Sequence, residues 1–259
     1  MSILEDIKAE FRLRKATFRD GNVADFYRCR WWNTNVPLLV FRIISAIFCL
    51  IILIVQFATS TGGNNTLVGL SAFTIWSYVI VISYFIVSSI TSVLQARHGC
   101  RNGSYGEEDT TYEQLPIYMR IQWCLYNIAL PSAILVTMIY WGVLYPMLTS
   151  AGYKVAIFMD LSVHAFNTIL MMIEQYIGSV PTRIAHVYQP ITYGIIYAIF
   201  SAIMYAVYDL VLYPYVLDWG NPITAASITG ILIYYLVAQF VLYLIYRAQC
   251  ICLSRRPTV

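Results

Sequence analysis

The sequence has little charge. Only 11% of its 259 residues are Asp, Glu, Lys or Arg, whereas 59% are hydrophobic. An average soluble domain carries about 25% charged and about 45–50% apolar residues. A chain with so few polar groups cannot cover a water-facing globule. We therefore exclude a soluble enzyme, a nucleic-acid-binding protein and a disordered chain, and we predict an integral membrane protein.

The sequence also lacks the motifs of soluble catalytic domains. Its longest predicted loop, roughly 96–118, contains no phosphate-binding glycine loop, no paired-cysteine zinc pattern and no nucleophile elbow. The first 35 residues carry many charges and no apolar core, so they do not form a signal peptide. We expect no metal, no cofactor and no nucleic-acid partner, and we expect any chemistry to lie within the membrane.

Six apolar segments are present, and each is long enough to cross roughly 30 Å of hydrocarbon. They cover approximately 37–57, 73–95, 119–146, 155–178, 190–208 and 225–247. The short alternating segments of an outer-membrane barrel are missing. The sequence predicts an all-α, six-span transmembrane helical bundle. Its expected parts are a basic N-terminal segment (1–36), the six-helix domain (37–249) and a short tail (250–259).

Basic residues are distributed unevenly about these segments. Of the 16 Lys and Arg residues, only Lys154 is predicted to lie on the far side of the membrane, while Arg42 lies at the start of the first span. Short cytosolic loops are enriched in Lys and Arg, so both termini are predicted to be cytosolic. None of the six cysteines lies in a predicted outer loop, so no disulfide framework is expected.

Two features suggest covalent modification. Cys250 and Cys252 follow the last span on the predicted cytosolic side. They are either reduced thiols or sites of reversible palmitoylation. Asn64 begins an Asn-Asn-Thr sequon in the first outer loop. It is either a glycosylation site or lies too close to the membrane to be modified.

Polar residues form a stripe along the fourth span. Asp160, His164, Asn167 and Glu174 are spaced by four, three and seven residues, which places them on one face of an α-helix. At 1.5 Å per residue the stripe is ~21 Å long. Facing lipid, these groups would cost several kcal/mol, so we expect the stripe to face protein or a wet cavity.

Other spans offer partners for this stripe. Arg120, near the start of the third span, and Glu174, near the end of the fourth, are predicted at similar depth on antiparallel helices. A salt bridge between them would act as a structural clamp. Amides are available at Asn127 and Gln239 on the third and sixth spans. The predicted structural polar cluster comprises Arg120, Asn127, Asn167, Glu174 and Gln239.

His164 is the residue of this stripe that is best suited to acid–base chemistry. It lies near mid-span, and Asp160, one turn away, would orient it or raise its basicity. His164 as base and Asp160 as orienter supply two of the three parts of a nucleophile–base–orienter arrangement. The hydroxyl nucleophile is not identified, because Ser and Thr are scattered through several spans. The alternative is a histidine that joins helices by hydrogen bonding.

The same residues carry a resemblance to a known family. The stretch Val163-His164-Ala165-Phe166-Asn167-Thr168-Ile169-Leu170, with Ile173-Glu174, Pro181-Thr182-Arg183 and His186, resembles the rolling stone family. Trp123, Pro131, Tyr140-Trp141, Tyr193-Gly194, Tyr197 and Tyr213-Pro214 fit as well. The resemblance covers roughly residues 30–250. It implies a multi-pass plasma-membrane protein of myoblast fusion, with the endoplasmic reticulum as the alternative location. The implied partners are membrane lipids and lateral membrane proteins.

A more distant resemblance points to a lipid hydrolase. His164, with Ile173-Glu174 and Pro181-Thr182-Arg183, is similar to the histidine segment of the androgen-induced protein family. That family implies six spans and hydrolysis of fatty-acid esters by a membrane-embedded threonine and a histidine. Val40 stands where that threonine is expected, and Thr34 lies six residues earlier. Valine has no hydroxyl to attack an ester, so the nucleophile stays unassigned.

Three functional hypotheses follow from these features. The first is a fusion factor of the rolling stone type without catalysis. The second is an intramembrane hydrolase of fatty-acid esters that uses His164. The third is a transporter or proton pathway through Asp160, His164 and Glu174; it ranks last because no inverted repeat or pair of broken helices is evident.

Overall fold

The computed structural model describes residues 7–8, 10–18, 21–60, 69–102, 115–152, 156–214 and 216–254. Within these residues, six helical segments are long and apolar enough to cross a membrane. The predicted all-α, six-span bundle is therefore confirmed. The segments are longer than predicted at some ends: the third covers Ile117–Ser150, and the fifth begins at Ile184. Pro190 does not interrupt the fifth, because it lies in the first turn of its α-helix, where its missing N–H has no helical partner.

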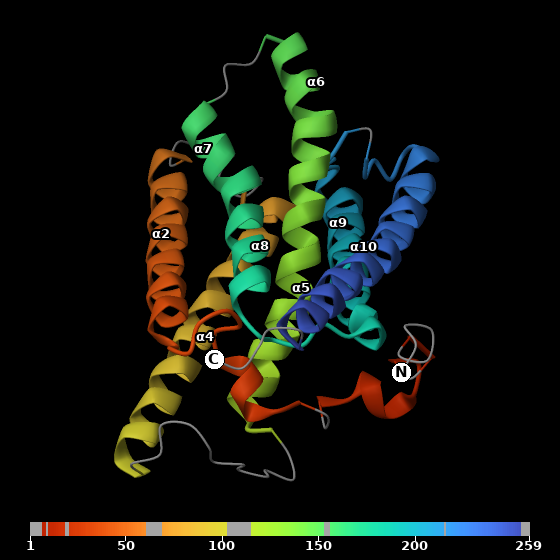
Figure 1. Cartoon of the computed structure of the whole chain (residues 1–259). Helices are drawn as coiled ribbons and strands as arrows, with labels where there is room; N and C mark the ends of the chain where they lie inside the picture. The colour runs from red at the N-terminus through yellow and green to blue at the C-terminus, as the bar shows by residue number, and fades with distance from the viewer. Residues whose placement is uncertain are drawn as a thin grey trace.

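Six helical spans follow one another along the described part of the chain (Figure 1). The first two spans are α2 (Val36–Ser60) and α4 (Phe73–Asn102). The third comprises α5 (Ile117–Ile139), η4 (Tyr140–Leu144) and α6 (Tyr145–Ser150). The fourth comprises α7 (Ile157–Leu161), η5 (Ser162–Phe166) and α8 (Asn167–Ile177). The last two are η6 (Ile184–Val187) with α9 (Tyr188–Tyr208), and α10 (Ile223–Ser254).

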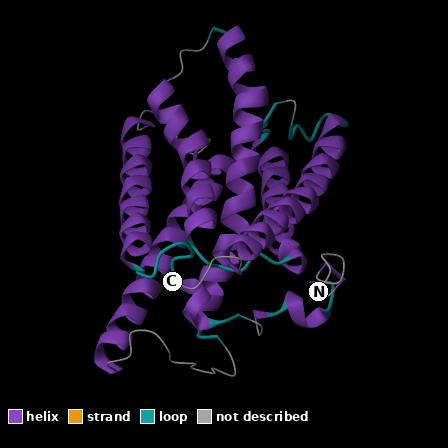
Figure 2. Cartoon of the chain, in the orientation of Figure 1, coloured by secondary structure: helices purple, strands orange, loops and turns teal. Residues whose placement is uncertain are grey.

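The helix α5 lies at the centre of the bundle. It contacts α4, α8, α9 and α10, while α2 packs on α4 and α8. We call the end of the bundle where α2 begins and α10 ends the basal end, and the opposite end the distal end (Figure 1). Figure 2 shows the drawn helices in purple with teal loops between them, and no orange strand among the described residues.

The N-terminal residues pack against the basal end. The short 3₁₀ turns η1 (Leu13–Ala16) and η3 (Val23–Phe26) precede α2. Phe26 is fully buried and meets the Trp123 ring edge-on, with the centroids 5.5 Å apart. The backbone N–H of Arg30 donates to Ile177 O at 2.8 Å. This segment therefore fixes the basal end of α8 to the start of α2.

Two spans contain π-helical turns, η4 and η5, which have i→i+5 hydrogen bonds in place of i→i+4. Pro146 accounts for η4, because it has no N–H to donate to Gly142, four residues earlier. At η5 the Asn167 side chain accepts a bond from Thr168 N at 2.7 Å, and the His164 carbonyl accepts one from Thr137 Oγ1 at 2.5 Å. A regular α-helix would join Thr168 N to that carbonyl. Side-chain competition therefore widens this turn.

Candidate functional site

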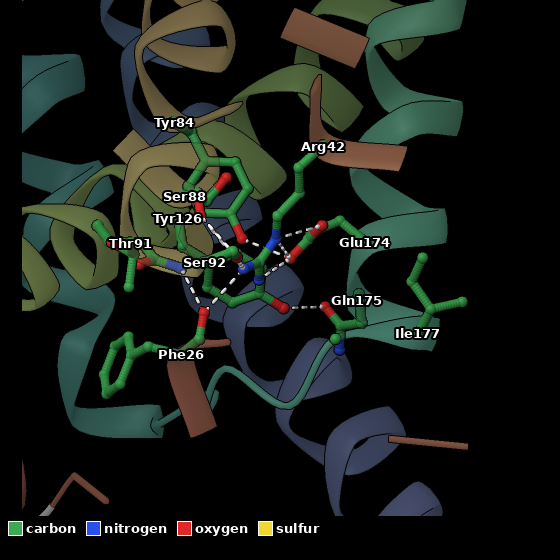
Figure 3. Close-up of polar contacts among 12 residues, drawn as sticks. Phe26, Arg42, Tyr84, Ser88, Thr91, Ser92, Tyr126, Glu174, Gln175 and Ile177 are labelled. Atoms are coloured by element: carbon green, nitrogen blue, oxygen red, sulfur yellow. Dashed lines mark hydrogen bonds and ion pairs between the residues drawn. The ribbon is translucent and has the colours of Figure 1, made fainter. Parts of the chain in front are cut away.

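A buried ion pair lies at the basal half of the bundle (Figure 3). Arg42 of α2 places Nη2 2.6 Å from Glu174 Oε1 of α8, and both side chains are 0% exposed. Arg42 Nε donates to both carboxylate oxygens, at 3.1 and 3.3 Å. The hydroxyl of Tyr84 on α4 donates to Oε1 at 2.7 Å. Three helices thus converge on one carboxylate.

The second terminal nitrogen of Arg42 binds other segments. Nη1 donates to Phe26 O and to Ser92 Oγ, both at 2.8 Å. The Phe26 carbonyl also accepts a bond from Gln122 Nε2 of α5 at 3.0 Å. We call this set the Arg42 cluster; it comprises Phe26, Arg42, Tyr84, Ser92, Gln122 and Glu174. It joins α2, α4, α5, α8 and the N-terminal segment. Such hydrogen bonds offset the cost of burying two charges.

The salt bridge that the sequence suggested is wrong in one partner. Glu174 binds Arg42, whereas Arg120 Nε donates to the Leu115 carbonyl at 2.7 Å. Arg120 and Glu174 were paired because of their similar predicted depth in the membrane, but depth alone does not show which arginine side chain faces Glu174. Arg42 carried a signal that we did not use: it is a charged residue within the apolar run of α2, so it required a partner inside the bundle.

The other predicted polar residues are buried, but they form separate groups. Asn127 Nδ2 contacts His186 Nδ1 at 2.9 Å and donates to Gln189 Oε1 at 3.0 Å. Gln239 Nε2 donates to Arg183 O at 2.7 Å, which fixes α10 to the loop after α8. Asn167 is fully buried directly after the π-helical turn η5, and among the described residues it forms no hydrogen bond with Glu174.

Asp160 and His164 are not joined. The imidazole of His164 stacks on the Tyr140 ring, with the centroids 3.5 Å apart and the planes at 3°. Its Nδ1 is buried without a hydrogen-bond partner in the described structure, and Asp160 interacts instead with the Tyr140 hydroxyl. The expectation that Asp160 orients His164 is thus not met. The reason is η5, which begins between the two residues and alters the four-residue register of an α-helix.

Two hydroxyls lie beside the backbone of His164. Thr137 Oγ1 of α5 donates to the His164 carbonyl and lies 2.7 Å from Thr168 Oγ1. In the described residues neither hydroxyl bonds to the imidazole, so a nucleophile–base pair is not formed. Val40 is 46% exposed on the outside of α2, and Thr34 Oγ1 accepts a bond from Val36 N at the start of that helix.

The proposed proton pathway also lacks continuity. Glu174 is bound by Arg42 and Tyr84, and it lies ten residues from His164, or ~15 Å along the helix. Asp160 is directed to Tyr140. The three ionisable groups of the stripe therefore belong to two separate sites.

The two predicted lipidation cysteines have different environments. The Cys250 thiol accepts a bond from Arg30 Nη1 at 3.4 Å, and the Arg30 guanidinium lies 5.0 Å from the centroid of the Tyr246 ring. Cys252 is exposed. The predicted glycosylation residue, Asn64, lies outside the described residues.

Comparison with known proteins gives one consistent result. A family model described as "Protein rolling stone" matches residues 2–255. A protein of Drosophila melanogaster with the name "Protein rolling stone" is 28% identical over 272 residues, which cover 94% of this chain and 92% of that protein. No solved structure matches. The match includes all six spans and every residue of the Arg42 cluster.

Proposed function

The chain belongs to the rolling stone family, and from this membership we propose that it is a plasma-membrane protein that acts in cell–cell fusion, as in myoblasts. The observation that carries the proposal is the extent of the match, which covers the whole bundle rather than one helix. The basal end faces the cytosol in this proposal, because Lys and Arg residues flank the spans there.

The proposed action is lateral, within the plane of the membrane. The segments that join helices at the distal end are 61–72, 151–156 and 209–222. Segments this short provide little surface for recognition of a second cell. Large apolar side chains are instead exposed along the outer faces of α2, α9 and α10, among them Ile54, Ile203 and Val237. Membrane lipids and neighbouring membrane proteins are therefore the proposed partners.

A cell-mixing experiment tests this role. Myoblasts that lack the protein are given the wild-type chain, the Glu174→Gln variant or the matched surface variant Ile54→Val, and the fraction of nuclei in multinucleate cells is counted. Wild-type and Ile54→Val chains are expected to restore fusion, and Glu174→Gln to restore less at equal expression. Normal fusion without the protein refutes the role, and confinement of the protein to the endoplasmic reticulum refutes the location.

An intramembrane hydrolase is the second candidate, and the free Nδ1 of His164 favours it. In an ester hydrolysis His164 would accept the proton of the attacking water and return it to the leaving alcohol, which gives a fatty acid and an alcohol. Purified protein is offered fluorescent or branched fatty-acid esters, beside the His164→Ala, Thr137→Val and Thr168→Val variants. Turnover that is lost in His164→Ala supports the enzyme. Lack of turnover in a wild-type chain that restores fusion refutes it.

A further inference from the structure

A cavity of about 520 Å³ lies in the distal half of the bundle. It is bounded by the first turn of α4, by the last turns of α5, by η4, α9 and α10, and by the loop that joins the last two helices. This volume is within the range of roughly 300–1,000 Å³ that is typical of small-molecule sites. We propose that the cavity is a binding site for one hydrocarbon chain of a membrane lipid.

A row of small residues on α9 creates the space. Gly194, Ala198, Ala202 and Ala206 are spaced by four residues, so they share one face of the helix, and all four line the cavity. In membrane proteins a row of this kind usually allows a second helix to pack closely. Only Gly194 is used that way here, since a Cβ added to it would lie 3.2 Å from Tyr235. The three alanines leave the space open.

The polar groups of the cavity wall are bonded to other protein groups. Three of these bonds are Tyr197 Oη to Ser71 O at 2.9 Å, Tyr235 Oη to Ser132 Oγ at 3.1 Å and Trp219 Nε1 to Ser201 Oγ at 3.1 Å. The remaining polar side chains of the wall also have partners, since Tyr213 interacts with Thr74 and Tyr140 interacts with Asp160. The rest of the lining is largely Ile, Leu, Val and Ala. A buried water needs two to four polar partners, which this wall does not offer. The favoured occupant is therefore as apolar as the wall.

The ends of the cavity distinguish a lipid chain from a partner helix. Tyr213, Leu217 and Trp219 of the distal loop line one end, and the contact between Gly194 and Tyr235 limits the other. The row of small residues extends over only ~18 Å. A transmembrane helix is about 30 Å long and about 10 Å wide, so it does not fit in a cavity of about 520 Å³. A flexible chain can enter a shorter site that is closed at both ends.

The bilayer gives lateral access to this site. Ile195, Ile199 and Ile203 line the cavity and are also 46%, 56% and 53% exposed on the outer surface of α9. They form a rim between the cavity and the surrounding lipid. A chain from the adjacent leaflet can therefore bend into the cavity while its headgroup stays at the membrane surface.

Photolabelling of the purified full chain tests the proposal. The protein is reconstituted in phosphatidylcholine vesicles that contain a phosphatidylcholine with a diazirine within one acyl chain, and labelled residues are mapped by mass spectrometry after illumination. Labels are expected to concentrate on residues 194–206 and 228–235. In Ala202→Phe the added ring fills the cavity, and labelling there is expected to fall about tenfold. In the matched control, Ala226→Phe, the exposed ring lies outside the cavity lining and labelling is expected to persist.

The outcomes separate binding from general lipid contact. Equal labelling of every lipid-facing helix, α2 included, with no change in Ala202→Phe, overturns the proposal. If Ala202→Phe does not elute as a folded species, Ala206→Phe is used, because residue 206 lines the cavity and is itself exposed. The experiment is independent of the role in fusion, since it measures labelling of the isolated protein.

Discussion

The Arg42 cluster gives a quantitative prediction about stability. In Glu174→Gln the fold keeps the side-chain shape but loses the negative charge beside Arg42, whose side chain is fully buried. Removal of one partner of a buried pair costs about 3–5 kcal/mol, because the remaining charge has no compensation. We expect that loss in the free energy of unfolding for Glu174→Gln, and a similar loss for Arg42→Met.

The double variant Arg42→Met/Glu174→Gln is expected to recover most of this loss, because the structure leaves few orphaned groups behind. The Phe26 carbonyl keeps its bond from Gln122, and Ser92 Oγ still donates to Ser88 O at 2.9 Å. The glutamine oxygen can accept the bond from the Tyr84 hydroxyl. Replacement of a buried pair by uncharged groups of similar volume is often close to neutral.

The assay is unfolding of the four proteins in mixed micelles, followed by tryptophan fluorescence as the denaturing detergent is increased. The two single losses and the double loss give a coupling energy, which is expected to be favourable and to exceed about 2 kcal/mol. A matched control is Ile51→Met on the exposed face of α2, which is expected to change stability by less than about 0.5 kcal/mol. Additive losses in the double variant would refute the reasoning.

Three further predictions concern other regions. Burial raises the pKa of Asp25 to about 6, against the opposing effects of the Asn22 backbone and of Arg30. Because the folded-state pKa lies above the usual 3.8, the free-energy cost of burying the charged carboxylate is absent below pH 3.8, grows as the pH rises and is complete above about pH 6. Asp25→Asn is therefore expected to protect the N-terminal segment from protease at about pH 8 but not at about pH 4. Cys252→Ser is expected to remove more labelling by an alkynyl palmitate than Cys250→Ser, since Cys252 is exposed and Cys250 bonds to Arg30; the reverse order contradicts this. Thr137→Val is expected to lower the free energy of unfolding by about 0.5–1.5 kcal/mol, because the His164 carbonyl loses a donor. Thr149→Val, whose hydroxyl bonds only to its own helix, is the control, and equal losses argue against the prediction.

The two polar regions of the bundle have different physical characters. At the Arg42 cluster almost every donor and acceptor is bonded, which is the arrangement of a structural clamp. Near His164, by contrast, Trp141 Nε1, Asp160 Oδ2, His164 Nδ1 and Asn167 Nδ2 are buried without partners in the described structure. The two π-helical turns, which often mark functional sites, lie in this second region. Tests of chemistry should therefore begin at His164 and tests of folding at Glu174.

The sequence alone predicts the six spans, because a run of apolar residues must be buried in hydrocarbon wherever its neighbours lie. It also determined that Glu174 faces the interior, since an exposed carboxylate in lipid is too costly. It carried the family resemblance, which the match over residues 2–255 confirmed. Each of these conclusions depends on one segment at a time.

Which side chains meet depends on how the helices pack together. Arg42, rather than Arg120, reaches Glu174 because the rotation and depth of α2 against α8 are set by packing over the whole interface. Asp160 and His164 separate because Asn167 and Thr137 together displace the Thr168 N–His164 O bond and so widen the turn η5, which begins between Asp160 and His164; Thr137 comes from another helix. The cavity depends on how α5, α9 and α10 are placed relative to one another. Side-chain pairs and cavities between helices depend on the relative positions of several helices. The periodic pattern of residues in one helix carries no information about those positions.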